Sequence, residues 1–244
     1  MALVVSFFNK AKLIVRNVQY RLWKRKNKSA SFKDYFAEIV QKHIQSGRAH
    51  PTLGDNLAGK TFGVSGHRSF MLLARRYGIQ ASDVCVDYGC GTLRVGLHAI
   101  EYLKPGCYWG LDVSDFLLNR GRELIGADLE HRKAPNLRVI SGSSLREAAA
   151  AHPKLVFSIS VLVHVHPDEL SEYFTNILSL IDGNGVGMIT TEWTGGDTYQ
   201  TARQSWVHSV TTLRDAAPGN LTFIERAKRS NRTGGVIEVR GSAN

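Results

Sequence analysis

The chain has 244 residues, a length that suits one α/β domain with an extension. Hydrophobic residues make up 43% of it and charged residues 21%, so it can bury a core of ordinary size. Its three cysteines, Cys85, Cys90 and Cys107, include no CxxC pair, which argues against a disulfide framework and a zinc site.

The formal net charge of +10 is unevenly distributed. Residues 1–28 contain eight Lys or Arg and no acidic residue, whereas the remainder has 23 basic and 21 acidic residues. The basic character therefore belongs to an N-terminal arm, which weakens the case that the whole protein binds nucleic acid. No apolar run reaches the roughly 18 residues of a membrane span, and the apolar start precedes its charges, unlike a secretory signal. We expect a cytoplasmic protein.

The N-terminal third is predicted to be helical with one long loop. Apolar residues recur at helical spacing over 1–26, and a second helix should run from an N-cap at Ser31 to Gln45. Residues 47–66 are rich in Gly, Asp and Asn and are predicted to be a loop, followed by a helix from Arg68 to Tyr77. We divide the chain into an arm and lid segment, 1–66, and a domain, 67–244.

The domain alternates between apolar strands and amphipathic helices. Strands are predicted at 84–87, 108–112, 137–140, 155–160 and 185–191, and helices at 93–102, 114–126, 167–181 and 198–214. The last two strands, 221–225 and 236–240, are too close for a crossover helix and should form an antiparallel hairpin. These elements predict an α/β fold with a doubly wound, mostly parallel seven-stranded sheet, a terminal hairpin and an N-terminal helical extension.

A glycine turn follows the first strand of the domain, where ligands bind in sheets of this kind. Gly89 and Gly91 allow close approach of the backbone to a ligand, and Asp87 is expected to end the strand with its carboxylate facing the crevice. The third glycine of a dinucleotide fingerprint is replaced by Arg94. A carboxylate at Asp87 would repel a pyrophosphate but suits a cationic ligand end.

A second carboxylate, Asp112, ends the next strand 25 residues later and can accept the hydroxyls of a ribose. A ligand with a cationic amino-acid end, a ribose and no phosphate is S-adenosylmethionine. Each of the two aspartates could instead cap the helix that follows it.

The segment from Val84 to Ile189 resembles class I S-adenosylmethionine-dependent methyltransferases. Asp87-x-Gly89-x-Gly91 is similar to the first motif of that family, and Asp112 with Val113 is similar to the second. Ser143 stands where the family often has an aspartate on the adenine amino group, and Leu93 stands where a third glycine is frequent. The resemblance implies a cofactor site built from Asp87, Gly89, Gly91, Asp112, Val113, Ser143 and Ser160.

The end of the fourth strand should form the acceptor side of this site. It lacks the Asn/Asp-Pro-Pro-aromatic sequence of many enzymes that methylate nitrogen, so we favour oxygen as the acceptor atom. His164 is the candidate base, with backbone hydrogen bonding at a helix start as its alternative role, and His166 is expected to be structural. Glu192 is a second catalytic candidate. His67 and Arg68 are candidate lid residues, with an exposed loop as the simpler interpretation.

The basic arm has three interpretations. Its cations and bulky apolar residues are typical of a helix lying on an anionic membrane surface. Equally, it could pack on the domain or on a second subunit; RNA binding ranks third. We therefore expect methyl transfer to a small-molecule, glycan or lipid-linked acceptor, with the inner membrane face as one location. The alternatives are an RNA methyltransferase and a non-catalytic cofactor-binding scaffold.

Overall fold

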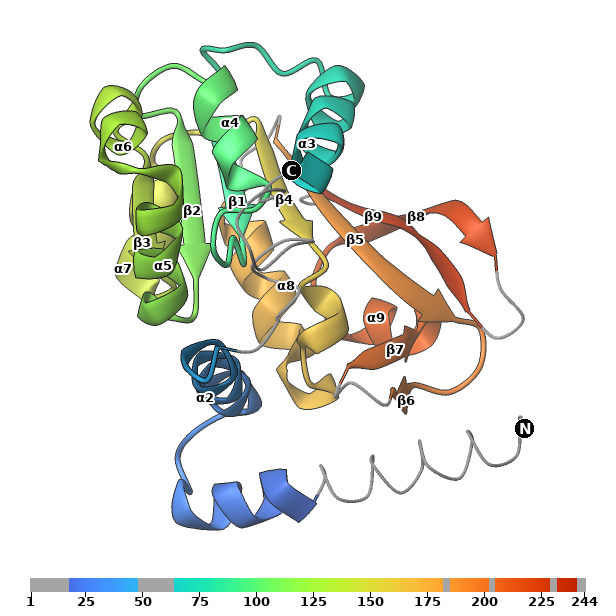
Figure 1. The fold of residues 1–244 in the computed structure, drawn as a ribbon. Helices are drawn as coiled ribbons and strands as arrows, with labels where there is room; N and C mark the ends of the chain where they lie inside the picture. Colours follow the sequence, from blue (N-terminus) through green and yellow to red (C-terminus); the bar gives the residue numbers. More distant parts are fainter. Residues whose placement is uncertain (1–17, 48–63, 182–184, 202–204, 229–231, 241–244) are drawn as a thin grey trace, which may run out of the picture.

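The computed structural model describes residues 18–47, 64–181, 185–201, 205–228 and 232–240 (Figure 1). An unlabelled helix covers 18–26. The labelled elements follow in chain order: α2 (Phe32–Gln45), α3 (Val64–Arg76), β1 (Cys85–Tyr88), α4 (Gly96–Tyr102), β2 (Tyr108–Asp112), α5 (Asp115–Ile125), α6 (Ala127–Lys133), β3 (Asn136–Val139), α7 (Gly142–Ala149), β4 (Leu155–Ile159), the 3₁₀ turns η2 (Leu162–His164) and η3 (Pro167–Glu169), α8 (Leu170–Ser179), β5 (Val186–Thr194), β6 (Tyr199–Gln200), β7 (Trp206–Ser209), α9 (Val210–Ala216), β8 (Asn220–Lys228) and β9 (Thr233–Arg240).

The sheet has the predicted doubly wound, mostly parallel character. Strands β3, β2, β1, β4 and β5 are parallel neighbours in that order. Strand β9 pairs antiparallel with β5, and β8 pairs antiparallel with β9. The terminal hairpin is therefore confirmed, and its return strand lies inside the sheet beside β5.

Two apolar cores cover the two faces of this sheet. One contains Phe70 of α3 and Ile100 of α4, and the other contains Phe174 of α8 and Leu213 of α9. Because both faces are covered, the central strands are apolar on both sides. The exceptions lie at their carboxyl ends, where Asp87 and Asp112 are buried.

The segment predicted as a helix over 198–214 folds differently. It forms β6, β7 and the short helix α9, so the sheet of the described residues has nine strands rather than seven. The side chain of Ser209 accepts the backbone N–H of Thr212 and so fixes the start of α9. The residues directly before it, which include Trp206 and Val207, form β7, which pairs in parallel with the end of β5; β6 pairs antiparallel with β7.

Other boundaries also differ from the prediction. Helix α3 starts at Val64, so the predicted loop to residue 66 ends too late. Helix α7 was not predicted; a capping box between Ser141 and Ser144 begins it. The predicted loop itself and residues 1–17 of the arm lie outside the described residues.

Helix 18–26 and α2 lie beyond the carboxyl ends of the parallel strands (Figure 1). The carboxylate of Glu169 accepts the backbone N–H of Phe32 at 2.6 Å and so caps the start of α2. The ring of Phe32 packs edge-on against Trp206, with centroids 4.7 Å apart. The described part of the arm, 18–47, therefore packs on the domain. No helix within the described ranges is long and apolar enough to cross a bilayer.

Candidate functional site

The glycine turn between β1 and α4 is held tightly against its neighbours. Gly89 and Gly91 have φ values of 80° and 55°, the left-handed region that favours glycine. The N–H groups of Gly89 and Cys90 donate to the carbonyl of Leu111 at 2.7 and 3.1 Å. A Cβ at Gly89 would lie 2.4 Å from Val161 Cγ2, so position 89 has no room for a side chain.

Leu93 keeps the backbone shape of the glycine it replaces in the family pattern. Its φ is 65°, a costly value for a leucine, and its side chain is completely buried. Space for this side chain comes from Gly121 of α5, where a Cβ would lie 2.8 Å from Leu93 Cγ. A glycine on a neighbouring helix thus accommodates the missing glycine of the turn.

Asp112 connects the turn to the end of β2. Its Oδ2 accepts the N–H of Gly91 at 2.8 Å, and its Oδ1 accepts the N–H of Ser114 at 2.9 Å. The side chain is 5% exposed, and burial raises the pKa of the carboxyl group. An ionised carboxylate has about four acceptor positions, so Asp112 keeps some acceptor capacity after these bonds. Asp112 and Gly91, both predicted site residues, therefore lie in direct contact.

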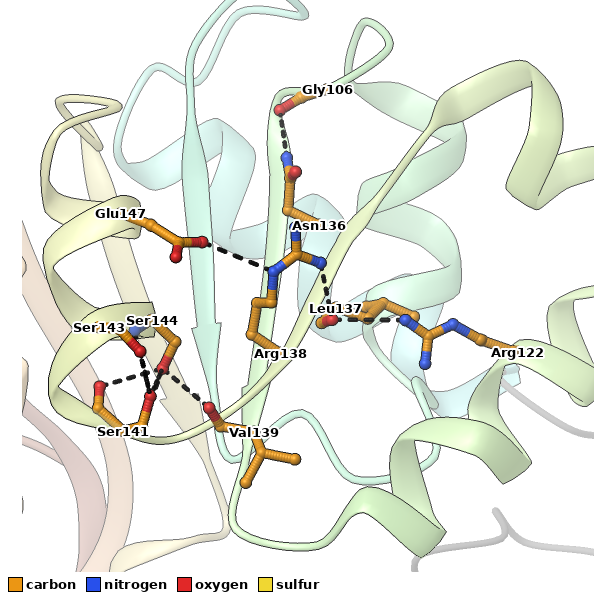
Figure 2. Close-up of polar contacts among 10 residues, drawn as sticks. All are labelled: Gly106, Arg122, Asn136, Leu137, Arg138, Val139, Ser141, Ser143, Ser144 and Glu147. Carbon is orange, nitrogen blue, oxygen red and sulfur yellow. Dashed lines mark hydrogen bonds and ion pairs between the residues drawn. The ribbon is translucent and has the colours of Figure 1, made fainter.

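Two exposed apolar side chains, Val113 and Val139, lie next to Asp112 in the chain and in the sheet. Val113 is 39% exposed and Val139 is 40% exposed, and Val139 is the register partner of Asp112 on β3. Val113 was predicted to bind the cofactor, and Val139 was not singled out because its strand resembles any other in the sequence. Figure 2 shows Ser141, Ser143 and Ser144 gathered where the chain turns from Val139 into α7.

Ser143 is exposed in this turn and lies within hydrogen-bonding distance of Ser141, with 3.0 Å between their hydroxyl oxygens. Ser144 is buried and donates to the Val139 carbonyl at 2.8 Å. The ion pair of Arg138 and Glu147, 3.6 Å apart, joins β3 to α7 beside it (Figure 2). Ser143 is thus an accessible hydroxyl, beside the exposed Ser141, in a turn that is held at several points.

We expected Asp87 to end its strand with its carboxylate facing the crevice, but the structure differs. Strand β1 continues to Tyr88, and Asp87 is 3% exposed. The hydroxyl of Tyr108, on the neighbouring strand, donates to Asp87 Oδ2 at 3.0 Å. Burial raises the pKa of Asp87 to about 7, opposed by the Tyr108 hydrogen bond. The carboxyl group is therefore buried against the hydroxyl of Tyr108 rather than exposed at the end of the strand.

The end of β4 carries backbone strain at a predicted site residue. Ser160 has a φ of 61° and is exposed. Its N–H donates to Thr190 Oγ1 of β5 at 2.9 Å. The next residue, Val161, provides the methyl groups that close over Gly89. Strain in a non-glycine residue at a strand end is frequent at functional sites, and here it aims the chain from β4 toward the glycine turn.

His164 belongs to η2, directly after β4. Its Nδ1 lies 3.1 Å from Ser205 Oγ, and its ring stacks on Phe36 of α2 with centroids 4.7 Å apart and planes at 25°. His166 has a structural contact of the expected kind: its Nδ1 accepts the N–H of Asp168 at 3.2 Å and caps η3. Ser205 and Phe36 were missed because they are far from His164 in the chain.

The remaining candidates have less favourable settings. Glu192 on β5 forms an ion pair with Arg232 at 2.8 Å, so its charge is balanced by a cation. His67 and Arg68 lie on the exposed face of α3 rather than in a loop. Gly66, just before them, packs against Arg94 at the far end of the glycine turn, where a Cβ would lie 2.0 Å from the Arg94 carbonyl oxygen.

The chain matches no protein-family model and no curated protein, but it is similar to solved structures. Magnesium protoporphyrin IX methyltransferase (ChlM) from Synechocystis PCC 6803 with bound SAM aligns at 14% identity and a TM-score of 0.56, over 86% of this chain and 95% of that one. The N-terminal domain of EvdMO1 with SAH bound aligns at 12% identity and a TM-score of 0.50, over 72% of this chain and 81% of that one.

The [4+2]-cyclase SpnF also aligns, at 12% identity and a TM-score of 0.55, over 73% of this chain and 82% of that one. These likenesses show that the chain has the fold of the class I methyltransferases. At such low identity they show the fold alone, and the presence of a cyclase among them illustrates that one fold serves more than one reaction.

Proposed function

We propose that this protein is an S-adenosylmethionine-dependent methyltransferase that acts on a small-molecule, glycan or lipid-linked acceptor, at oxygen. The observation that carries the proposal is the setting of Asp112. Its buried carboxylate holds the amide of Gly91, keeps acceptor capacity, and adjoins the exposed apolar side chains of Val113 and Val139. A carboxylate can accept the hydroxyls of a ribose, and exposed apolar side chains beside it can contact the attached adenine.

The residues present fit the rest of this cofactor as well. Gly89 and Gly91 have no side chains, so the backbone of the turn can lie close to a ligand. Ser143 offers a hydroxyl on the adenine side, where the family often has a carboxylate. Asp87 is buried just before the turn in the chain, where it attracts a cationic ligand end through the electrostatic field. SAM and SAH are bound in the similar structures of ChlM and EvdMO1, which supports this choice of cofactor.

When bound, S-adenosylmethionine supplies a methyl group on a positively charged sulfur. What remains for the protein is to align the acceptor and to remove a proton from a hydroxyl group. His164 is our candidate base because it follows the strained end of β4, which reaches over the glycine turn. Glu192 is a weaker candidate, since its carboxylate is already engaged in an ion pair with Arg232 at 2.8 Å.

The arm also bears on the acceptor. Along helix 18–26, Val18 and Leu22 are 47% and 51% exposed, and Arg21, Arg25 and Lys26 are exposed beside them. This face combines apolar and cationic side chains, which supports a peripheral contact with an anionic membrane that presents a lipid-linked acceptor. Flotation with phosphatidylserine vesicles tests the contact. The full chain should float, and the triple variant Arg21→Glu, Arg25→Glu, Lys26→Glu should not; equal flotation contradicts it.

Methyl-labelled S-adenosylmethionine tests the function itself. The full-length protein is incubated with an aqueous metabolite extract, an organic lipid extract or total RNA. In each, methyl label that survives treatment with base is counted separately from methyl label that base releases. Label in the aqueous or organic fraction that depends on the protein is the expected result. Label confined to RNA favours the alternative in which the basic arm guides an RNA methyltransferase. Cofactor binding without label in any fraction favours a non-catalytic scaffold, and both outcomes contradict the proposal.

A further inference from the structure

His164 is held between two parts of the chain that are remote from it in sequence. Ser205 lies directly before β7, the strand that pairs in parallel with the end of β5. Phe36 comes from α2, in the arm. The hydroxyl oxygen of Ser205 is 3.1 Å from His164 Nδ1, and the ring of Phe36 stacks on the imidazole. Both contacts act on the side chain that we propose as the acceptor-side base.

Strand β7 fixes the turn that carries this histidine. Trp206 packs edge-on against His166, with centroids 5.2 Å apart. His208 is completely buried beside the backbone of Leu162 and Val165, where burial lowers its pKa to about 4 and keeps it neutral. Neither of its ring nitrogens has a hydrogen bond of good geometry, so it holds the turn by packing. Strand β7 therefore lies against the η2 turn through several side chains, and Ser205, which directly precedes β7, contacts His164.

The nitrogen that carries the proton in a neutral imidazole is set by the hydrogen bond made at the other nitrogen. If Ser205 Oγ accepts from Nδ1–H, the lone pair is on Nε2 and the imidazole can take a proton. If Ser205 donates instead, Nε2 carries the proton and the lone pair is on Nδ1, where it accepts from Ser205, so Nε2 cannot take a proton from the acceptor. The contact between Ser205 and His164 thus decides whether His164 can serve the chemistry.

We propose that Ser205 is a positioning residue that accepts a hydrogen bond from Nδ1–H of His164, so that the lone pair of the imidazole is on Nε2, the nitrogen that we assign to the acceptor hydroxyl. The inference rests on the proposed function. In the transfer, the acceptor oxygen bonds to the methyl carbon as the carbon–sulfur bond breaks, and that electron pair stays on sulfur. The hydroxyl proton passes to Nε2 of His164 and then to solvent.

Phe36 has a separate effect on the same ring. An aromatic face has no strong hydrogen-bond acceptor, so the stack limits rotation of the imidazole without choosing its tautomer. The two neighbours can therefore be distinguished by experiment. Loss of the Ser205 hydroxyl should change the tautomer, whereas loss of the Phe36 ring should leave it unchanged.

The tautomer can be read directly by long-range ¹H–¹⁵N correlation spectra of the full-length protein labelled at histidine nitrogen, with and without SAH. His164→Gln assigns the signal. The variants are Ser205→Ala and Phe36→Leu, and Ser171→Ala serves as a control because it removes an exposed hydroxyl on α8. Binding of SAH to each protein is measured separately by calorimetry.

We expect wild-type His164 to be protonated at Nδ1 alone. Ser205→Ala should give a mixture of the two tautomers, while Phe36→Leu and Ser171→Ala keep the wild-type form. A proton on Nε2 in the wild type overturns the proposal whether or not the variants fold, and so does an unchanged tautomer in folded Ser205→Ala. Failure of the wild type to bind SAH would instead remove the proposed function, so the two failures are distinguishable.

Discussion

Replacing Tyr108 by phenylalanine removes the hydroxyl that donates to Asp87 Oδ2 across 3.0 Å. The Asp87 carboxyl group is 3% exposed, and burial raises its pKa from the ordinary value of 3.8 to about 7. In the folded protein it is therefore neutral at pH 5.5 and mostly ionised at pH 8.5. The unfolded chain ionises near pH 4, so the unfavourable effect of this group on stability grows from about pH 4 to pH 7 and is then constant.

The cost of Tyr108→Phe should follow the charge on Asp87. At pH 5.5 the substitution removes a hydrogen bond between neutral groups, worth about 1 kcal/mol. At pH 8.5 it removes a bond to a buried carboxylate, worth about 1.5–3 kcal/mol. We therefore expect the loss in free energy of unfolding to be larger at pH 8.5 than at pH 5.5, by about 1 kcal/mol.

Urea unfolding of the wild type and the variant at both pH values measures this difference. Tyr102→Phe is a matched control, because the hydroxyl of Tyr102 donates to the uncharged carbonyl of Ile79 at 2.8 Å. Its cost should be the same at both pH values. An equal cost of Tyr108→Phe at pH 5.5 and 8.5 would refute the reasoning, because it would mean that Asp87 does not change charge in this range.

Three other substitutions test the surroundings of the site. Gly121→Ala should destabilise the fold by about 1–3 kcal/mol in urea unfolding, because its Cβ would lie 2.8 Å from Leu93 Cγ. In a Leu93→Ala background this cost should be relieved; additive effects of the two substitutions would contradict the contact. Glu169→Ala should expose the arm to limited proteolysis, because it uncaps α2, and wild-type cleavage rates would argue against that role. Affinity for S-adenosylmethionine should rise between pH 6 and 7.5, because the cationic end of the cofactor favours ionised Asp87, whose pKa is raised to about 7. Calorimetry should show this rise in the wild type and a flatter dependence of affinity on pH in Asp87→Asn.

Much of the fold is encoded in local patterns that can be read without a structure. Strand β2 runs from Tyr108 to Asp112 as predicted, and Ser31 and Ser114 cap their helices through side-chain hydrogen bonds. The antiparallel hairpin followed from the shortness of its connection. The predicted helix over 198–214 is confirmed only from Val210, where α9 begins. It was wrong over β6 and β7, because pairing with the end of β5 favours strands there.

The site was predictable only where one residue carries its own signal. Asp112 and the glycines stand at recognisable distances along the chain, and the structure brings Asp112 to Gly91. The hydrogen-bond donor to the buried Asp87 carboxyl group is Tyr108, 21 residues away, and no pattern in the sequence marks it as a partner. The contacts of His164 with Ser205 and Phe36 depend on tertiary packing over still longer separations, which periodicity does not encode.

Calorimetric titration with S-adenosylmethionine tests the central claim most directly. The account predicts saturable binding to the wild type and, for Asp112→Ala, a loss of affinity of about 10-fold or more, since hydrogen bonds to a charged group are worth about 1.5–3 kcal/mol. Asp115→Ala, which removes an exposed carboxylate three residues further on, should bind like the wild type. Absence of binding to the wild type at millimolar cofactor, or equal affinity of wild type and Asp112→Ala, would contradict the account.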